Sequence, residues 1–170
     1  MPHHADPGRV ELRDGSHTLV VTRTLATTRD DAWAWVTHPE LLAQWIGLLE
    51  GEARVGATIA FTMTAEENAP PESARIIACE RGHSYTCEVG GAGTPDSWII
   101  GCELDGPDGA LALSIVQPIA SAEMAGMMGP GWEYYLDRLL AARTASTMPD
   151  FDDYYPAHAA HYEGAFAAAH

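Results

Sequence analysis

The sequence predicts an α+β fold, in which an antiparallel sheet of about six to seven strands lies on a long C-terminal helix. Residues 121–145 repeat apolar side chains at helical spacing. Residues 53–118 are alternating segments separated by turn residues, which is typical of antiparallel strands. Two short helical segments follow the first strand. Helices segregated from an antiparallel sheet define the α+β class.

The C-terminal helix is predicted over residues 121–145. Ser121 is a suitable N-cap, and Glu123 favours the positive end of the helix dipole. The apolar face of the second half consists of Trp132, Tyr135, Leu136 and Leu139. The Gly129-Pro130-Gly131 segment predicts a break, so the segment is either one long helix or a short helix running into a longer one. The side chains of Tyr134, Asp137, Arg138 and Ala141 are expected on a solvated side.

The earlier elements follow from local signals. Residues 17–25 alternate and predict the first strand, and Thr28 is a helix N-cap with Asp31 three residues on. Pro39 suits the first turn of a second short helix. Later strands are predicted at residues 53–55, 58–64, 73–80, 83–89, 97–104 and 110–118. This divides the chain into a flexible arm (1–16), one domain (17–146) and an acidic, aromatic extension (147–170).

Composition excludes several classes of partner. Arg and Lys together number 9 against 24 acids, a net charge of −15, and such a surface repels nucleic acid and anionic membranes. No apolar run approaches the ~20 residues of a membrane span, and the N-terminus has no signal-peptide pattern, which predicts a cytoplasmic protein without membrane insertion. The three cysteines are widely spaced, which favours free thiols over a disulfide framework.

Three stretches carry a resemblance to a known family. They are residues 32–40 (AWAWVTHPE) continuing to Trp45, residues 55–57 (VGA) before an alternating strand, and Gly131-Trp132 followed by Leu136 and Leu139. The sequence resembles the SRPBCC (START-like, helix-grip) superfamily, and within it single-domain proteins related to the C-terminal domain of the Hsp90 ATPase activator. The resemblance covers residues 17–146. It departs from the family pattern at His38, where a capping Asp is usual.

The resemblance implies a curved sheet wrapped on the C-terminal helix, with a ligand cavity between them. Aromatic and Met side chains with a few polar groups are typical of small-molecule pockets. The alternative is a packed core without a ligand. The expected ligand-binding residues are Trp45, Trp98, Ile100, Cys102, Leu113, Ile115, Met124, Met128, Trp132, Tyr135 and Leu136, and Gln117 shares a strand face with Ile115.

No catalytic residue can be assigned from the sequence. No nucleophile or phosphate-binding motif is present, and the acid–base candidates are His38, Asp96, Glu103 and Tyr135 without a defined pair. Arg23 lies on an apolar strand face, where it either pairs with a buried carboxylate or receives an anionic ligand group; solvent exposure at the strand end is the favoured reading.

No metal or cofactor is expected. Cys79 is placed opposite Ser84 and Cys87 opposite Ile76, so that the two thiols do not share a metal. His158 and His161 have helical spacing near acidic residues, but a solvated tail is the favoured reading.

Three functions are compatible with the sequence. The favoured one is a non-enzymatic protein that binds a small hydrophobic or amphipathic molecule, such as a lipid. The second is a polyketide cyclase- or hydratase-like enzyme that uses the same cavity, and the third is an Hsp90-type co-chaperone. The aromatic residues of the 147–170 extension predict that it folds back over the domain or packs against a second copy in a homodimer.

Overall fold

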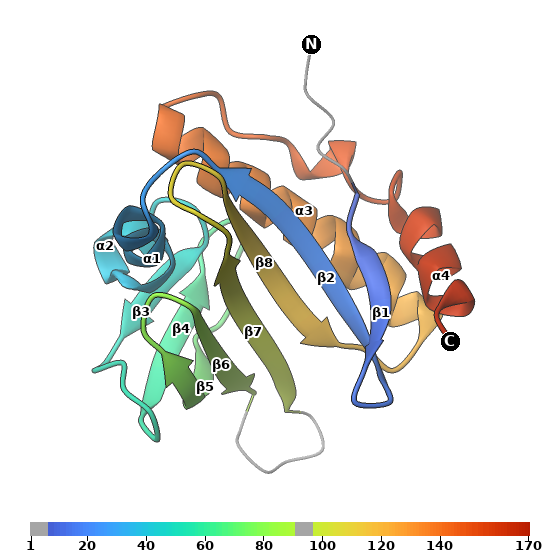
Figure 1. Cartoon of the computed structure of the whole chain (residues 1–170), viewed down its shortest axis with the longest axis horizontal. Coiled ribbons are helices and arrows are strands. Elements are labelled where there is room, and N and C mark those ends of the chain that lie inside the picture. Colours follow the sequence, from blue (N-terminus) through green and yellow to red (C-terminus); the bar gives the residue numbers. More distant parts are fainter. Residues whose placement is uncertain (1–6, 91–96) are drawn as a thin grey trace. The chain divides into compact units, whose positions relative to one another are not determined.

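The computed structural model describes residues 7–90 and 97–170. The strands are β1 (Arg9–Arg13), β2 (Ser16–Leu25), β3 (Gly47–Glu50), β4 (Thr58–Met63), β5 (Glu72–Glu80), β6 (Ser84–Val89), β7 (Trp98–Asp105) and β8 (Leu111–Pro118). The helices are α1 (Arg29–Thr37), α2 (Pro39–Leu42), α3 (Ala122–Thr144), the 3-10 turn η1 (Phe151–Asp153) and α4 (Ala159–Ala168). Figure 1 shows their course along the chain.

The predicted α+β class is confirmed. The eight strands in the described part of the chain form one sheet in the order β1-β2-β8-β7-β6-β5-β4-β3. The chain folds as two compact units, which we call the terminal unit (residues up to Arg23 and from Ser114) and the central unit (Thr24–Leu113). No helix of the described residues is long and apolar enough to cross a membrane.

The terminal unit begins with a hairpin that the sequence did not predict. Residues 9–13 were expected in a flexible arm, but β1 pairs antiparallel with β2, from Arg9 opposite Val20 to Arg13 opposite Ser16. Asp14 and Gly15 form its two-residue turn with φ of 50° and 79°. Positive φ at both turn residues matches the twist of paired strands and suits Asp-Gly. Residues 1–6 lie outside the described residues.

The long helix α3 is continuous through Pro130, so of the two predicted alternatives the single long helix is observed, without a break at Gly129-Pro130-Gly131. The predicted N-cap is present, since Ser121 Oγ accepts the Met124 N–H at 3.1 Å. Gly126 and Gly129 lie against α4: a Cβ on Gly129 would lie 2.4 Å from the Tyr162 ring, and one on Gly126 would lie 2.7 Å from Glu163 Oε1. The glycines therefore admit a neighbouring helix and do not interrupt their own.

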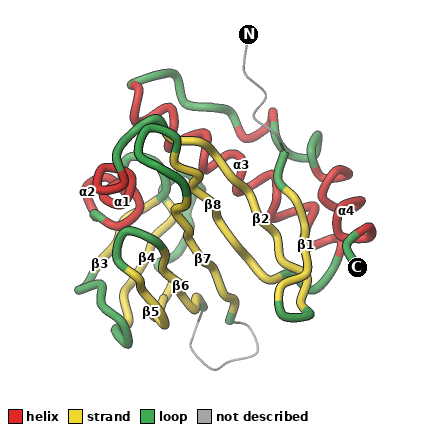
Figure 2. The backbone as a smooth tube through the Cα atoms, in the orientation of Figure 1, coloured by secondary structure: helices red, strands yellow, loops and turns green. Residues whose placement is uncertain are grey.

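In the central unit, α1 begins at its predicted N-cap, with Thr28 Oγ1 accepting the Asp31 N–H at 3.2 Å. Figure 2 shows α1 and α2 together at one end of strands β3–β7. The helix α2 ends at Leu42, and the following strand is β3 at Gly47–Glu50; no strand forms at residues 53–55. β3 begins at Gly47, which lies against Phe61 of β4. A Cβ at this position would lie 2.8 Å from the Phe61 ring.

The β5–β6 ladder contains a bulge at Ile77. Ile76 is opposite Cys87 as predicted, but the register shifts and places Cys79 opposite Tyr85. The prediction that Cys79 is opposite Ser84 is therefore wrong. The extra residue turns Cys79 to the sheet face that carries Tyr85 and Cys87, because one inserted residue reverses the alternation of a strand.

Candidate functional site

In the terminal unit, the buried side-chain amide of Gln117 lies beside Trp132, one of the predicted ligand-binding residues. Gln117 of β8 is fully buried, and its Oε1 accepts the indole N–H of Trp132 at 2.8 Å. An indole N–H can only donate, so this bond fixes which end of the Gln117 amide is oxygen. The Gln117 Nε2 then points elsewhere, and among the described residues it has no hydrogen-bond partner. A buried donor without a partner costs about 1–3 kcal/mol.

One predicted ligand-binding residue, Trp132, contacts this amide. The other predicted residues of the terminal unit lie on the same two elements, α3 and β8. The rings of Trp132 and Tyr135 are 6.0 Å apart with an interplanar angle of 51°. Leu136 and Ile115 are buried, whereas Met124 and Met128 are half-buried. The structure thus places Trp132 in contact with both Gln117 and Tyr135 and leaves the two Met side chains partly accessible.

In the central unit, one face of strands β3–β7 is apolar and only partly covered. Ile59, Ala74, Val89 and Trp98 are directly opposite one another across β4, β5, β6 and β7. Three of these are buried, while Trp98, Ile100, Cys87 and Leu49 pack against them and are half-buried. We call this set the apolar face. It contains the predicted residues Trp98 and Ile100, and partial exposure of large apolar side chains is typical of a binding surface.

Three other predicted residues of the central unit belong to its core. Trp45, Cys102 and Leu113 are at most 2% exposed. The Trp45 indole N–H donates to the Trp35 carbonyl oxygen at 3.0 Å, so its polar atom is already satisfied. Their burial is explained by packing alone.

Tyr85 was not predicted, although it shares the face of β6 with Cys87. It lies opposite Cys102 of β7, and Trp33 of α1 contacts its ring edge-on at a centroid distance of 6.0 Å. Burial raises the pKa of Tyr85 well above its ordinary value, with smaller contributions from Cys102 and Cys87. The hydroxyl therefore stays protonated, and it is hydrogen-bonded to Cys102.

The thiols differ in expected reactivity. Burial raises the pKa of Cys87 to about 11 and that of Cys102 to about 12, whereas Cys79 is exposed. Only the thiolate is nucleophilic, so at pH 8 the two raised thiols are almost entirely unreactive. We expect iodoacetamide to modify Cys79 alone in the native protein and all three cysteines in urea, as read by peptide mass spectrometry. Native modification of Cys102 at the rate of Cys79 would contradict this assignment.

Arg23 is buried and paired, so the favoured prediction of solvent exposure is wrong. It is 4% exposed, and its Nε donates to Asp137 Oδ1 at 2.6 Å while Nη1 donates to the Thr22 carbonyl oxygen at 3.0 Å. Tyr154 also donates to Asp137, at 2.8 Å. The alternative prediction, pairing with a carboxylate, is the one observed, although Asp137 is half-buried and not buried as predicted. The carboxylate was missed because Asp137 was expected on a solvated side of the helix.

A buried carboxylate also joins α3 to the C-terminal extension. Glu133 is 3% exposed, and it accepts from the Tyr162 hydroxyl and lies 2.6 Å from His158 Nδ1. Tyr162 Oη also accepts the Gly8 N–H at 2.9 Å. Burial, together with the Glu133 carboxylate, raises the pKa of Tyr162 above its ordinary value. The bonds of this cluster join α3 to α4 and to Gly8, so we interpret it as the attachment of α4 and assign it no chemistry.

The extension also explains why Tyr134 of α3 is not solvated. Tyr134 and Ala141 were expected on the exposed side, but both are buried. The Tyr134 ring contacts Phe151 and Tyr154 edge-on, at centroid distances of 5.3 and 5.7 Å. Residues 151–168 thus fold back on α3, one of the two predicted arrangements.

The acid–base candidates do not define a catalytic pair. His38 is exposed after α1, Glu103 is half-buried on β7, and Tyr135 belongs to the terminal unit. Asp96 lies outside the described residues. Across residues 7–90 and 97–170, no group of three or more His, Cys, Asp or Glu side chains is arranged to hold a metal ion.

Comparison with known proteins agrees with the fold. Residues 26–143 match the family model described as activator of Hsp90 ATPase homolog 1-like protein. No curated protein matches the sequence.

Solved structures with the same architecture cover between 76% and 96% of the chain. CalU16 from Micromonospora echinospora has a TM-score of 0.73 and 19% identity, covering 96% of this chain and 97% of its own. DynU16, described as a protein in the dynemicin biosynthetic locus, has a TM-score of 0.63 and 19% identity, covering 79% of this chain and 50% of its own. MLL2253 from Mesorhizobium loti has a TM-score of 0.64 and 16% identity, covering 76% of this chain and 98% of its own. These likenesses confirm the helix-grip fold.

Proposed function

The chain belongs to the family of activator of Hsp90 ATPase homolog 1-like proteins, and we propose that it binds a small amphipathic molecule carrying a hydrogen-bond acceptor such as a carbonyl oxygen. The observation that carries the proposal is the buried Gln117 Nε2, which has no partner among the described residues. A ligand oxygen accepting from this amide removes the cost of an unpaired buried donor. The neighbouring rings of Trp132 and Tyr135 supply the apolar contacts that small-molecule sites use.

The apolar face of the central unit supports binding of an apolar molecule independently. Trp98 and Ile100 are large and half-buried on adjacent positions of the same face of β7. Burying the exposed part of such side chains contributes about 25 cal/mol per Å². The affinity of a ligand for this face is expected to fall when Ile100 is replaced by serine, independently of any substitution at Gln117.

The proposal is tested with a fluorescent naphthalene ketone, 6-propionyl-2-(dimethylamino)naphthalene, and its analogue with a propyl group in place of the ketone. We expect the ketone to bind with micromolar affinity. Gln117→Met should weaken it about ten-fold, which corresponds to one hydrogen bond of about 1.4 kcal/mol. The propyl analogue, which lacks the acceptor, should bind both proteins equally.

This pair of probes separates a ligand contact from a packing effect. Gln117→Met also removes the acceptor of the Trp132 N–H. If this loss disturbs the packing of Trp132 and Tyr135, the binding of both probes should weaken alike. Equal weakening of both probes, unchanged ketone binding, or no binding of either probe would each contradict the proposal. Unchanged ketone binding would show that water satisfies the amide.

A second function, cyclase- or hydratase-like catalysis, is favoured by Tyr85. Its neutral hydroxyl is bonded to Cys102 in this structure, and it can donate to a substrate carbonyl that replaces the thiol and so stabilise a developing oxyanion. DynU16, a similar fold, is described from a biosynthetic locus. Under this proposal Tyr85→Phe abolishes turnover of a polyketide-like substrate while binding is retained. An Hsp90 co-chaperone role rests on the family's description alone.

A further inference from the structure

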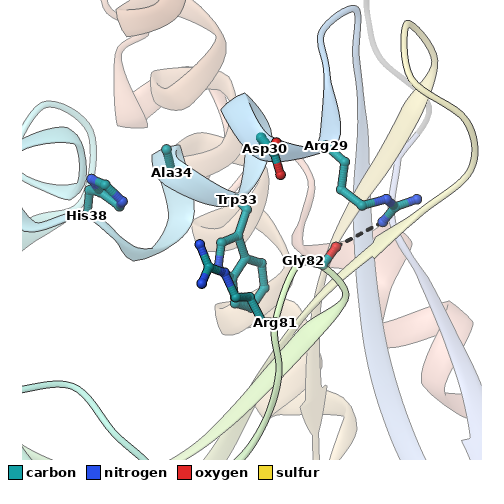
Figure 3. A pocket seen from close by; sticks show the side chains of 7 residues that line it. All are labelled: Arg29, Asp30, Trp33, Ala34, His38, Arg81 and Gly82. Atoms are coloured by element: carbon teal, nitrogen blue, oxygen red, sulfur yellow. Dashed lines mark hydrogen bonds between the residues drawn. The ribbon is translucent and has the colours of Figure 1, made fainter.

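A pocket of about 500 Å³ lies in the central unit, beside α1 and the turn between β5 and β6. Its lining residues are Arg29, Asp30, Trp33, Ala34, His38, Arg81 and Gly82 (Figure 3). The volume is in the range of about 300–1,000 Å³ that is typical of small-molecule sites. None of these residues belongs to the binding surfaces proposed above.

The charge of the lining is opposite to that of the chain. The whole sequence carries 24 acids against 9 Arg and Lys, but the pocket is lined by two arginines and one acid, Asp30. On a chain with so many acids, an anion is attracted to the side of such a pocket that carries an arginine and is repelled by most of the remaining surface.

Arg29 contributes a fixed positive charge. Its guanidinium donates to the carbonyl oxygens of Gly82, Leu104 and Gly106 at 2.9, 3.2 and 2.6 Å. Carbonyl partners hold the group in place without cancelling its charge, unlike a carboxylate. Two further acids lie near the start of α1. Asp108, in the turn between β7 and β8, accepts the Arg29 backbone N–H, and Asp31 accepts from Thr27 Oγ1. Asp30 and these two acids oppose an anion on that side, so the favourable side is that of Arg81.

Arg81 and Trp33 supply the two contacts that a planar anion needs. Arg81 is exposed, and within the described part of the chain it has no carboxylate partner. Its guanidinium is available for the bidentate pairing that carboxylates form with arginine. Trp33 is half-buried and held edge-on against Tyr85, so its indole is a fixed flat wall.

We infer that this pocket binds a small planar aromatic carboxylate, with the ring on Trp33 and the carboxylate on Arg81. The inference is independent of the proposed function, because it uses other residues and a ligand of another charge. It assigns a second ligand site to the central unit.

The test uses 2-naphthoate and its neutral analogue 2-naphthylmethanol, with binding measured by calorimetry and by the NMR signal of the Trp33 indole N–H. We expect Arg81→Gln to weaken 2-naphthoate at least ten-fold. Arg54→Gln is the matched control, since Arg54 is exposed in the same unit, lies outside the pocket and changes the net charge equally. Arg54→Gln should leave 2-naphthoate binding unchanged.

Three results would overturn the inference. Equal weakening by Arg81→Gln and Arg54→Gln would indicate a diffuse charge effect. Weakening by Gln117→Met and not by Arg81→Gln would place the naphthoate in the terminal unit. Binding of 2-naphthylmethanol as tight as that of 2-naphthoate would remove the role of the carboxylate. Both arginines are exposed, so neither glutamine variant is expected to unfold the protein.

Discussion

Gly129→Ala is expected to lower the free energy of unfolding by about 3 kcal/mol, because the new methyl group has no space. A Cβ at this position would lie 2.4 Å from the ring of Tyr162, which is fully buried and cannot move aside without displacing α4. For a chain of this length the melting temperature should fall by roughly 6–12 °C. Circular dichroism during heating measures the change, and faster proteolysis after residue 146 should accompany it.

Gly131→Ala is the matched control two residues along the same helix. Nothing lies within 4 Å of a Cβ at Gly131. Alanine is preferred over glycine inside a helix by about 1 kcal/mol, so this variant should be as stable as the parent or slightly more stable. If the two alanine variants lost the same stability, the effect would come from helix geometry around Pro130 and the packing of Tyr162 would not explain it.

Asp137→Ala is expected to cost about 3 kcal/mol, because it leaves the buried guanidinium of Arg23 without its carboxylate. The Arg23 side chain is 4% exposed, and its remaining bond is to the Thr22 carbonyl oxygen. Asp137 itself is 26% exposed, which places the expected cost at the lower end for buried pairs. Urea unfolding followed by circular dichroism gives the value.

The double variant Arg23→Met with Asp137→Ala tests the physical reason. Removing both charges leaves no unpaired ion, so the double variant should recover much of the stability lost by Asp137→Ala. A double variant that is less stable than Asp137→Ala by the full cost of Arg23→Met would show that the charges act independently, contrary to the pairing described above.

The elements with strong local signals were predicted well. Thr28 and Ser121 are helix caps as expected, because a cap depends on side chains within one turn. β1 was missed since its alternation covers only five residues with two apolar side chains, and its stability comes from pairing with β2. The role of Gly129 was missed because a glycine that breaks a helix and one that receives a ring look alike in sequence.

The candidate site was predicted in part for the same reason. Periodicity identified Trp132 and Tyr135 as one helix face and Trp98 and Ile100 as one strand face. It did not show that the indole N–H of Trp45 is already bonded to the Trp35 carbonyl oxygen. The bulge at Ile77 reversed the face of Cys79, and the unpaired donor of Gln117 depends on a bond to a distant tryptophan. Both depend on tertiary structure.

The attachment of α4 has a consequence for the order of folding. The bond from Gly8 to Tyr162 joins residues 154 positions apart, so it closes a loop of almost the entire chain. The entropy cost of closing a loop grows with its length, and contacts of such separation reward folding only after the intervening structure exists. We therefore expect α3 to form early and the packing of Tyr162 against Gly129 to form last. During refolding, the tyrosine fluorescence of the extension should recover later than the helical circular dichroism signal.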